Sequence, residues 1–309
     1  MLASILFIMK CLITGAAGFL GVHLTQTLKD QGHEVVGLDN FFHPCKAPDN
    51  GTLYADIRYY DEIEKYVEWA DIVFHLAAQI HVDRSIRFPQ ETADINIKGT
   101  LNVLEAVRKY NKQMVFASSS EVYGSSQVDY MSEFHQLDGQ SPYAASKTAG
   151  DRMCKAYFDT FGTKVAILRN FNVFGIWQND ASYGGVIAKF AKAAFKNEPL
   201  TIFGDGEQER DYMCVEDAIS GYLLLAKAGI YGKGINVGSG KTIKINELAE
   251  HIKRITGSQS EIIHVEPRPG EVQRLCADIT LAKAIGFVPG TDFEKDLTKY
   301  LNWYVKSCA

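Results

Sequence analysis

Residues 10–21 read KCLITGAAGFLG, an apolar run that ends in three glycines spaced three residues apart, Gly15, Gly18 and Gly21. Residues 22–28, VHLTQTL, continue the chain in a pattern that favours a helix. The stretch therefore predicts a buried strand, a tight turn and a helix N-terminus, where backbone N–H groups and the helix dipole suit a pyrophosphate. The spacing differs from the Gly-x-Gly-x-x-Gly of the commonest dinucleotide motif, so an ordinary glycine-rich turn is the alternative for this motif alone.

A second apolar strand, over residues 34–38, ends in an acid, Asp39. A carboxylate at the end of the second strand accepts hydrogen bonds from the adenosine ribose hydroxyls and repels a 2′-phosphate. Asp39 therefore predicts that the dinucleotide is NAD rather than NADP. The alternative, a turn formed by Asp39 and Asn40, does not exclude that role.

Tyr143 and Lys147 lie four residues apart near the start of a predicted helix over residues 142–161, downstream of the sequence SSSEVYG at residues 118–124. Side chains four residues apart are neighbours on a helix. A fixed positive charge beside a tyrosine favours the phenolate and lowers its pKa from the reference value near 10. We therefore expect Lys147 to lower the pKa of Tyr143, which would make it a base near neutral pH. Such pairs also occur by chance on long helices, so the prediction depends on the neighbouring motifs.

Short apolar strands alternate with longer helical stretches through the first half of the chain. The strands are expected at residues 12–13, 35–38, 72–75, 113–117 and 166–169, and the clearest helices at 90–109 and 142–161. This alternation predicts an α/β fold with a doubly wound parallel sheet. From about residue 175 the pattern breaks into short segments separated by Pro and Gly, which indicates a smaller C-terminal α/β domain. We expect one domain over residues 1–170, rejoined by about 211–238, and a second mainly over 171–309.

The composition excludes several classes of protein. The chain has 309 residues, 46% of them apolar, which is enough for a large core. Its net charge of −5 and its pI near 5.9 give no basic footprint for nucleic acid. Its six cysteines form no C-x-x-C pair, which is typical of reduced thiols in a cytoplasmic protein and predicts no metal site; they lie at positions 11, 45, 154, 214, 276 and 308.

Residues 2–9 form a short apolar stretch at the start of the chain. No positive residue precedes it, no cleavage site of small residues follows it, and it runs directly into the first predicted strand. We therefore expect neither a signal peptide nor a membrane anchor, and a true start at Met9 is the simpler interpretation.

Taken together, these motifs resemble those of extended short-chain dehydrogenases/reductases, specifically the NAD-dependent nucleotide-sugar epimerases and dehydratases, from about residue 10 to the C-terminus. The resemblance implies a Rossmann domain that binds NAD. It also implies a homodimer paired through the helices at 90–109 and 142–161. Segments 55–58, 75–79 and 96–100 are similar to those that contact the adenine, line the pyrophosphate and brace the active site. Segments 169–175, 203–212 and 268–271 are similar to those that hold the nucleoside diphosphate.

The resemblance also implies individual site residues. The catalytic residues are expected to be Ser119, Ser120, Glu121, Tyr143 and Lys147. The residues expected to bind the cofactor are Gly15, Gly18, Phe19, Leu20, Gly21, Asp39, Asn40, Asp56, Ile57, Leu76, Ala77, Ala78, Gln79, Asn96, Ser118, Tyr143 and Lys147. The residues expected to bind the nucleotide-diphosphate sugar are His81, Ser119, Glu121, Asn172, Val186, Arg210, Arg268 and Glu271.

In such enzymes NAD removes hydride from C4 of the sugar while a base takes the C4 hydroxyl proton, which gives a 4-keto sugar. Tyr143 fits the base, Lys147 the cation that bonds the nicotinamide ribose, and Ser119 the hydroxyl that polarises the C4 oxygen. An epimerase then returns the hydride to the opposite face. A dehydratase needs two further acid–base groups.

Two alternatives to an epimerase arise at Ser120 and Glu121. The 4,6-dehydratases carry Asp-Glu there, so one of their two groups is missing, whereas UDP-glucuronate decarboxylases carry a more similar Thr-Ser-Glu. Residues 81–85 resemble a dehydratase, whereas residues 268–274, RPGEVQR, resemble an epimerase. We expect a 4-epimerase of a UDP-hexose such as UDP-glucose or UDP-galactose. A dehydratase (4,6- or 5,6-) or a decarboxylase using Glu121 is the second interpretation. A non-catalytic NAD-binding regulator is the third, less favoured because the site is complete.

One further residue bears on the sugar. Leu275 falls where epimerases of this family place the residue that limits the size of the pocket. A leucine is smaller than the tyrosine that excludes N-acetyl groups, so we expect some tolerance of N-acetylhexosamines.

Overall fold

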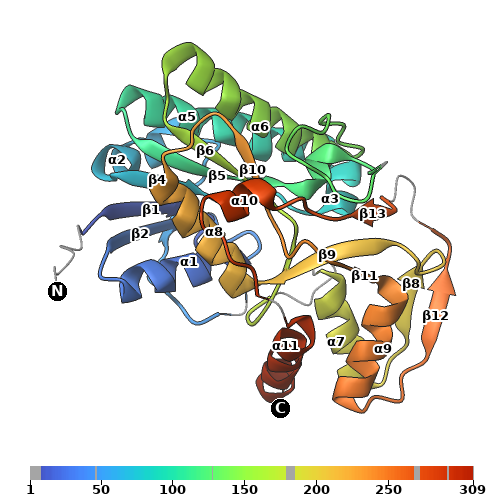
Figure 1. Cartoon of the computed structure of the whole chain (residues 1–309). Coiled ribbons are helices and arrows are strands. Elements are labelled where there is room, and N and C mark those ends of the chain that lie inside the picture. The colour runs from blue at the N-terminus through green and yellow to red at the C-terminus, as the bar shows by residue number, and fades with distance from the viewer. Residues whose placement is uncertain are drawn as a thin grey trace, which may run out of the picture.

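The computed structural model describes residues 8–45, 47–126, 128–178, 185–267, 272–290 and 292–308 (Figure 1). The strands are β1 (Lys10–Thr14), β2 (Glu34–Asp39), β3 (Leu53–Tyr54), β4 (Ile72–His75), β5 (Gln113–Ser119), β6 (Val165–Asn170), β7 (Asn172–Phe174), β8 (Leu200–Phe203), β9 (Glu209–Cys214), β10 (Gly234–Val237), β11 (Thr242–Lys244), β12 (Ile262–Val265) and β13 (Arg274–Leu275). The helices are α1 (Phe19–Asp30), α2 (Tyr60–Trp69), α3 (Val82–Arg87), α4 (Pro89–Ala93), the π-helical turn η1 (Asp94–Gly99), α5 (Thr100–Lys109), the 3₁₀ turn η2 (Ser120–Tyr123), α6 (Pro142–Phe161), α7 (Val186–Lys196), α8 (Val215–Ala228), α9 (Ile245–Thr256), α10 (Thr280–Ala284) and α11 (Phe293–Cys308).

Seven parallel strands form the main sheet, in the order β10-β6-β5-β4-β1-β2-β3. β1 lies inside it, with Leu12 paired to Val36 of β2 on one side and to Val73 of β4 on the other. The chain adds β2 and β3 on one side of β1 and then crosses to add β4 on the other. The loops that follow β1 and β4 therefore diverge and leave a crevice at the carboxyl ends of these strands. The expected doubly wound α/β fold is confirmed.

Helices cover both faces of this sheet (Figure 1). Alternate residues of β1 face opposite sides, so Cys11 and Ile13 pack in the core beneath α1 and α8, whereas Leu12 packs beneath α2, α5 and α6. A strand buried on both faces reads as a continuous apolar run, which is why residues 11–13 have no polar alternation.

The helical stretch expected over residues 90–109 is confirmed, and it consists of three consecutive segments, α4, η1 and α5, with right-handed helical backbone at both junctions. The π-helical turn η1 lies in the middle of this helical stretch and carries Asn96, whose buried side chain bonds the backbone of Gln79 in the loop after β4. Such turns are frequently found at functional sites.

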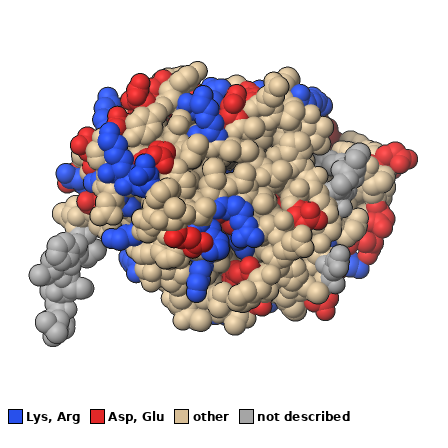
Figure 2. Space-filling model, turned by 90° about the horizontal axis from the view of Figure 1, so that it is seen from above, with Lys and Arg blue, Asp and Glu red and all other residues tan. Residues whose placement is uncertain are grey.

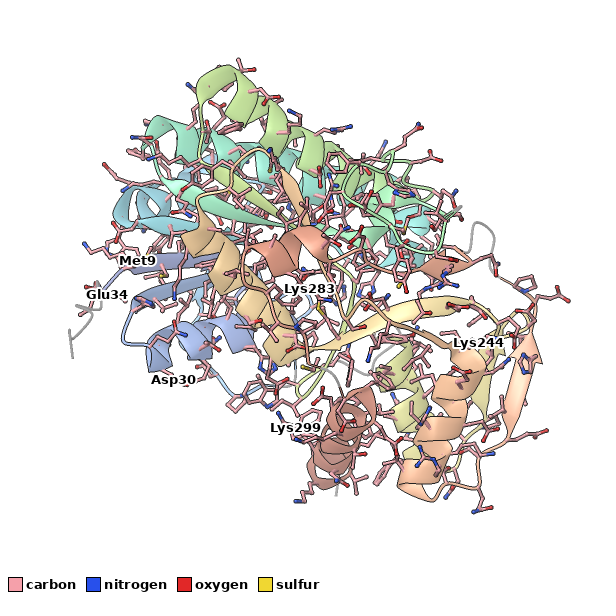
Figure 3. All side chains as sticks on the ribbon, viewed as in Figure 1. Met9, Asp30, Glu34, Lys244, Lys283 and Lys299 are labelled. Atoms are coloured by element: carbon pink, nitrogen blue, oxygen red, sulfur yellow. The ribbon has the colours of Figure 1, made fainter. Side chains whose placement is uncertain are left out.

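The later part of the chain builds a second, smaller layer around β9. β11 pairs with β9 antiparallel, while β7 and β13 pair with it in parallel, and β8 pairs with β12 in a separate two-stranded sheet. α7, α9 and α11 pack on these strands through a third apolar core. Figure 3 shows Lys244 in this layer, far from Met9 and Glu34 at the starts of β1 and β2. α8 and β10 lie in the main body instead, because β10 pairs with β6.

Lys299 of α11, labelled in Figure 3, joins the smaller layer to the main body by an ion pair with Glu216 of α8.

On the face shown in Figure 2, Lys and Arg are interspersed with Asp and Glu and form no single basic stripe. In the described part of the chain, no helix has the length and apolar character needed to cross a bilayer.

Candidate functional site

A cavity of about 1140 Å³ lies between the main sheet and the smaller layer. Gly15, Asp39 and Tyr143 line it from the main sheet and its helices. Val186 and Arg210 line it from the other side. A cavity at the carboxyl ends of a doubly wound sheet, where the strand order reverses, is the usual ligand site of such a fold.

The turn between β1 and α1 requires its glycines. Gly15 has a φ of +77°, and a Cβ on it would lie 2.6 Å from the backbone nitrogen of Ala77. A Cβ on Gly21 would lie 2.1 Å from the carbonyl oxygen of Gly15. The backbone of the turn is therefore packed against β4 and α1, and Gly18 precedes the first residue of α1 at the cavity. The N–H groups at the first turn of α1 have no partner within the helix, and together with the positive end of the helix dipole they fit the pyrophosphate of a dinucleotide.

Asp39 is held at the end of β2 by backbone hydrogen bonds. Its carboxylate accepts from the N–H of Ala17 at 3.1 Å and from the N–H of Phe41 at 2.7 Å. Burial raises the pKa of this carboxyl group, and the two backbone donors oppose the rise. The half-buried carboxylate lines the cavity beside the glycine turn, where it fits the adenosine ribose.

Asp56 lies deeper and is engaged by its neighbours. It forms an ion pair with Arg58 at 2.6 Å and accepts a hydrogen bond from Asn40 at 3.1 Å. Burial acts to raise the pKa of Asp56, but the hydrogen bonds from Arg58 and Asn40 outweigh it and lower the pKa. The predicted cofactor residues Asn40 and Asp56 thus touch each other on the cavity wall.

A hydrogen-bonded chain joins this wall to α6. Asn96 accepts from the backbone N–H of Gln79 at 2.8 Å and donates to the Gln79 carbonyl at 2.9 Å. The same Asn96 amide donates to the Ser146 hydroxyl at 2.8 Å, and Ser146 donates to the Tyr143 carbonyl at 2.7 Å. The π-helical turn that carries Asn96 therefore fixes the start of α6 relative to the loop after β4.

Tyr143 and Ser119 meet on the cavity wall. Burial raises the pKa of Tyr143 to about 12, a hydrogen bond with Ser119 opposes the rise, and the Glu121 charge adds to it. Lys147 donates to the carbonyl of Ala117 at 2.5 Å and lies 4.7 Å from the centre of the Phe116 ring. Burial lowers the pKa of Lys147 to about 8.

The expectation that Lys147 lowers the pKa of Tyr143 is therefore wrong for the protein alone. The Lys147 ammonium is directed at the end of β5, and loss of hydration dominates the pKa of the buried phenol. A phenol in this setting becomes an effective base when a positive charge is brought close to it. The nicotinamide ring of bound NAD carries such a charge.

Glu121 faces the same cavity from η2. The Ser119 hydroxyl accepts a hydrogen bond from the Glu121 N–H at 3.2 Å, and Ser120, also on the cavity wall, begins the turn. Burial raises the pKa of Glu121, and the positive charge of Arg210 opposes the rise. Arg210 comes from β9 in the smaller layer, so this pair of opposite charges spans the two sides of the cavity.

Comparison with known proteins agrees with this geometry. Residues 11–238 match the family described as the NAD dependent epimerase/dehydratase family. The chain belongs to this family. A Methanocaldococcus jannaschii protein named "Putative UDP-glucose 4-epimerase" is 38% identical over 94% of this chain and 97% of its own length. The UDP-N-acetyl-alpha-D-glucosaminuronate decarboxylase of Bacillus cytotoxicus is 33% identical over 96% of this chain and 97% of its own length.

A solved structure is similarly close. The UDP-glucose 4-epimerase of Thermotoga maritima with UDP-glucose superposes with a TM-score of 0.93 and is 31% identical, over 97% of this chain and all of that one. The recognition of an NAD-dependent epimerase/dehydratase enzyme from the sequence is thereby confirmed. The expected cofactor of this family member, NAD, is confirmed with it.

The structure gathers most of the predicted site residues around the one cavity. The predicted cofactor residues that line it are Gly15, Gly18, Phe19, Leu20, Gly21, Asp39, Asn40, Asp56, Ile57, Leu76, Ala77, Ala78, Gln79, Ser118, Tyr143 and Lys147. The predicted substrate residues that line it are His81, Ser119, Glu121, Asn172, Val186 and Arg210. Asn96 lies behind the wall and acts on it through Gln79. Arg268 and Glu271 lie outside the described residues.

Leu275 is not where it was expected. It is the last residue of β13, fully buried in the core, and it is absent from the described residues that line the cavity. Its pairing with Arg210 of β9 turns the leucine side chain into the apolar interior. The predicted tolerance of N-acetylhexosamines therefore loses its basis.

Several cavity residues were missed from the sequence. Phe42 and Phe88 stand at its rim on either side of Arg84, whose guanidinium lies 4.7 Å and 5.0 Å from their ring centres. Lys189 and Tyr212 line it from the smaller layer. No spacing rule singles these residues out, because they come from separate loops that only the fold brings together. In the described part of the chain, no group of three His, Cys, Asp or Glu side chains could hold a metal ion.

Proposed function

We propose that this chain is an NAD-dependent nucleotide-sugar 4-epimerase that acts on a UDP-hexose. The observation that carries the proposal is the position of three side chains, Tyr143, Ser119 and Lys147, in the wall of the cavity. The glycine turn lines one side of this cavity, and Arg210 and Val186 line the other. A dinucleotide bound at the turn and a nucleotide sugar held by the smaller layer would meet at these three side chains. The names of the M. jannaschii and T. maritima relatives support the same reaction.

Bound NAD supplies a hydride acceptor and donor for C4 of the sugar. The chain's own residues manage the proton. Tyr143 takes the proton of the C4 hydroxyl and returns it to the 4-keto sugar, and Ser119, hydrogen-bonded to Tyr143, orients the C4 oxygen. Lys147, whose ammonium is held by the Ala117 carbonyl near the end of β5, would bond the nicotinamide ribose.

Arg210 and Asn172 are placed to hold the substrate from the smaller layer. Arg210 lines the cavity at the edge of β9, and the Asn172 amide donates to the Asp211 carbonyl at 3.3 Å, which fixes the side chain on the cavity wall. An arginine at this place suits the diphosphate of a nucleotide sugar. We keep Arg268 and Glu271 as proposed nucleotide-binding residues on the sequence resemblance.

One observation favours a second candidate. Glu121 is a buried carboxyl group with a raised pKa beside Ser119, and a group of this kind can move a proton at C5 of a 4-keto sugar. This would serve a dehydratase or a decarboxylase, and the B. cytotoxicus relative is named as a decarboxylase. The epimerase is favoured because a dehydratase needs two such groups and Ser120 occupies the neighbouring position.

The mass of the product separates these candidates. The purified enzyme is incubated with UDP-glucose, UDP-N-acetylglucosamine, UDP-glucuronate and TDP-glucose, and each product is analysed by mass spectrometry. An unchanged mass with a changed sugar configuration supports the epimerase. Loss of water identifies a dehydratase and loss of carbon dioxide a decarboxylase, and either result overturns the proposal. No turnover of any substrate would support a non-catalytic NAD-binding regulator.

We further propose a cytoplasmic homodimer with a NAD domain over residues 1–170 and about 211–238 and a substrate domain mainly over 171–309. α5 and α6 lie side by side on the outside of the main sheet (Figure 1), with Leu101 and Phe161 exposed, which suits a two-fold helix pairing. The free thiols of the described cysteines suit a reducing compartment. Light scattering that reports only monomer at micromolar concentration would contradict the dimer.

A further inference from the structure

A buried carboxylate that the reaction does not use lies one turn beyond Lys147. Tyr143, Lys147 and Asp151 follow one another at four-residue intervals along α6, and all three side chains are buried on the face that packs on the main sheet. Gly150 allows this close packing, because a Cβ there would lie 2.7 Å from the ring of Phe116. The same ring lies beneath the Lys147 ammonium.

Asp151 is bound on its other side by a cation from the sheet. Arg169 of β6 donates through Nε to Oδ2 and through Nη2 to Oδ1, both at 2.9 Å. The hydroxyl of Ser118, a residue of the cavity wall, donates to Oδ2 at 2.8 Å. The second side of the Arg169 guanidinium donates to the Tyr123 hydroxyl at 2.9 Å. Asp151 therefore joins a rigid, buried network to the edge of the cavity.

Among the described residues, the Lys147 ammonium has two neutral neighbours. It donates a hydrogen bond to the Ala117 carbonyl, and the centre of the Phe116 ring lies 4.7 Å away. A buried ammonium with neutral partners loses much of its hydration and is costly to keep charged. A compensating negative charge nearby is therefore required for the cation to persist.

The other titratable groups packed near Lys147 do not supply this negative charge, whereas Asp151 can. Burial and the Lys147 charge lower the pKa of His75, from β4, to about 3, so His75 is neutral. Burial raises the pKa of the Cys154 thiol well above its usual value, so Cys154 is neutral too. Burial lowers the pKa of Lys147 itself to about 8, and negative charge at Cys154 or Asp151 acts against this. Of the two, Asp151 lies one helical turn beyond Lys147 on the same buried face of α6 and forms an ion pair with Arg169.

We propose that Asp151 is a positioning residue of the active site: its carboxylate, bound by Arg169 and lying one helical turn from Lys147, supplies the negative charge beside the buried Lys147 ammonium and fixes the Ser118 hydroxyl at the cavity wall. Arg169 competes with Lys147 for the same carboxylate, so it sets how much of the Asp151 charge Lys147 experiences. The inference rests on the proposed function in one respect, because only that function gives the Lys147 cation a role in catalysis. The effect of Asp151 on Lys147 belongs to the folded chain and does not require turnover.

The test measures the titration of Lys147 directly. Protein labelled with ¹³C at lysine Cε is titrated by NMR from pH 6 to pH 11, with and without added NAD, and the Lys147 signal is assigned by its loss in Lys147→Arg. Asp151→Asn removes the negative charge and is expected to lower the pKa of Lys147 by at least about one unit. Arg169→Gln removes the competing cation and is expected to raise it.

Two further variants keep the result interpretable. Tyr123→Phe disturbs the other side of Arg169 without changing any charge, so the Lys147 titration should not move. If Asp151→Asn does not fold, the double variant Asp151→Asn/Arg169→Gln replaces the ion pair by two neutral amides and leaves no unpaired buried charge. The pKa of Lys147 in this double variant is then compared with its pKa in Arg169→Gln alone. A purely structural role for Asp151 would change stability in all these variants without moving the Lys147 titration in opposite directions.

The alkaline limb of the turnover profile gives an independent readout. It should move to lower pH in Asp151→Asn and return toward the wild-type position in Asp151→Glu, which restores the charge. A Lys147 pKa that stays within about 0.3 unit of wild type in Asp151→Asn, well below the shift expected from a nearby opposite charge, overturns the inference. The NMR titration needs no turnover, so this outcome is distinct from failure of the epimerase proposal.

Discussion

Replacing Gly15 by alanine tests the glycine turn, and Gly257 offers a matched control. Both residues have left-handed backbone, with φ of +77° and +68°. A Cβ on Gly257 would meet nothing within 4 Å, whereas a Cβ on Gly15 would lie 2.6 Å from the backbone nitrogen of Ala77. The two variants therefore share the conformational penalty and differ in steric crowding.

The penalty of left-handed backbone for a residue with a Cβ is about 1–2 kcal/mol, which is the whole effect expected for Gly257→Ala. Forcing atoms into a packed region adds about 1–3 kcal/mol, so Gly15→Ala should lose about 2–5 kcal/mol of unfolding free energy. In Gly15→Ala the turn must also move away from β4, which would break a hydrogen bond between its backbone and the pyrophosphate. A hydrogen bond to a charged group contributes about 1.5–3 kcal/mol, so the affinity for NAD should fall roughly tenfold or more.

Denaturant unfolding and calorimetric titration with NAD measure the two effects. Gly257→Ala should bind NAD as the wild type does. Equal losses of stability and unchanged NAD affinity in both variants would refute the assignment of the Gly15 turn as the cofactor cradle.

Three further predictions concern the cofactor, the base and acid stability. Because Asp39 lines the cavity with a carboxylate, the protein should bind NAD well ahead of NADP, and Asp39→Ser should narrow the difference; equal or tighter binding of NADP by the wild type in calorimetry would count against the assignment. Tyr143→Phe keeps the ring and removes the base, so turnover should fall at least about a hundredfold with NAD affinity retained, and near-normal turnover would disprove the role. His75 is buried between the hydroxyls of Thr14 and Thr100, and burial lowers its pKa to about 3. Below pH 6.5 the unfolded chain binds a proton at His75 that the folded chain does not, so the stability present above pH 6.5 is lost as the pH falls toward 3. His75→Gln should flatten this loss in unfolding experiments between pH 7 and pH 4, whereas parallel curves for the two proteins would contradict it.

Much of the fold and of the cofactor wall followed from local sequence. Continuous apolar runs such as residues 11–13 identify strands buried on both faces, and the glycines at 15, 18 and 21 identify a tight turn in which a Cβ at 15 or 21 would clash with backbone atoms. Asp39 could be placed because its role depends only on its position at the end of a strand. Each of these features is determined by a stretch of about a dozen consecutive residues, so it can be recognised from the sequence alone.

The direction of individual side chains did not follow from local sequence. The spacing of Tyr143 and Lys147 was correct, but the energy of burying each group decides its pKa, and burial depends on strands far away in the sequence. The pairing of Asp151 with Arg169, eighteen residues apart, and the burial of Leu275 beside β9 likewise arise from packing between distant elements.

The fate of the hydrogen at C4 tests the central proposal most directly. UDP-glucose carrying deuterium at C4 is incubated with the wild type and with Glu121→Gln in ordinary water, and the product is analysed by NMR and mass spectrometry. The account predicts that both proteins form the C4 epimer with the deuterium still at C4, because hydride leaves and returns within one closed site and Glu121 has no required step. Deuterium found at C6 of a water-depleted product, or an epimer whose C4 hydrogen comes from water, would contradict it.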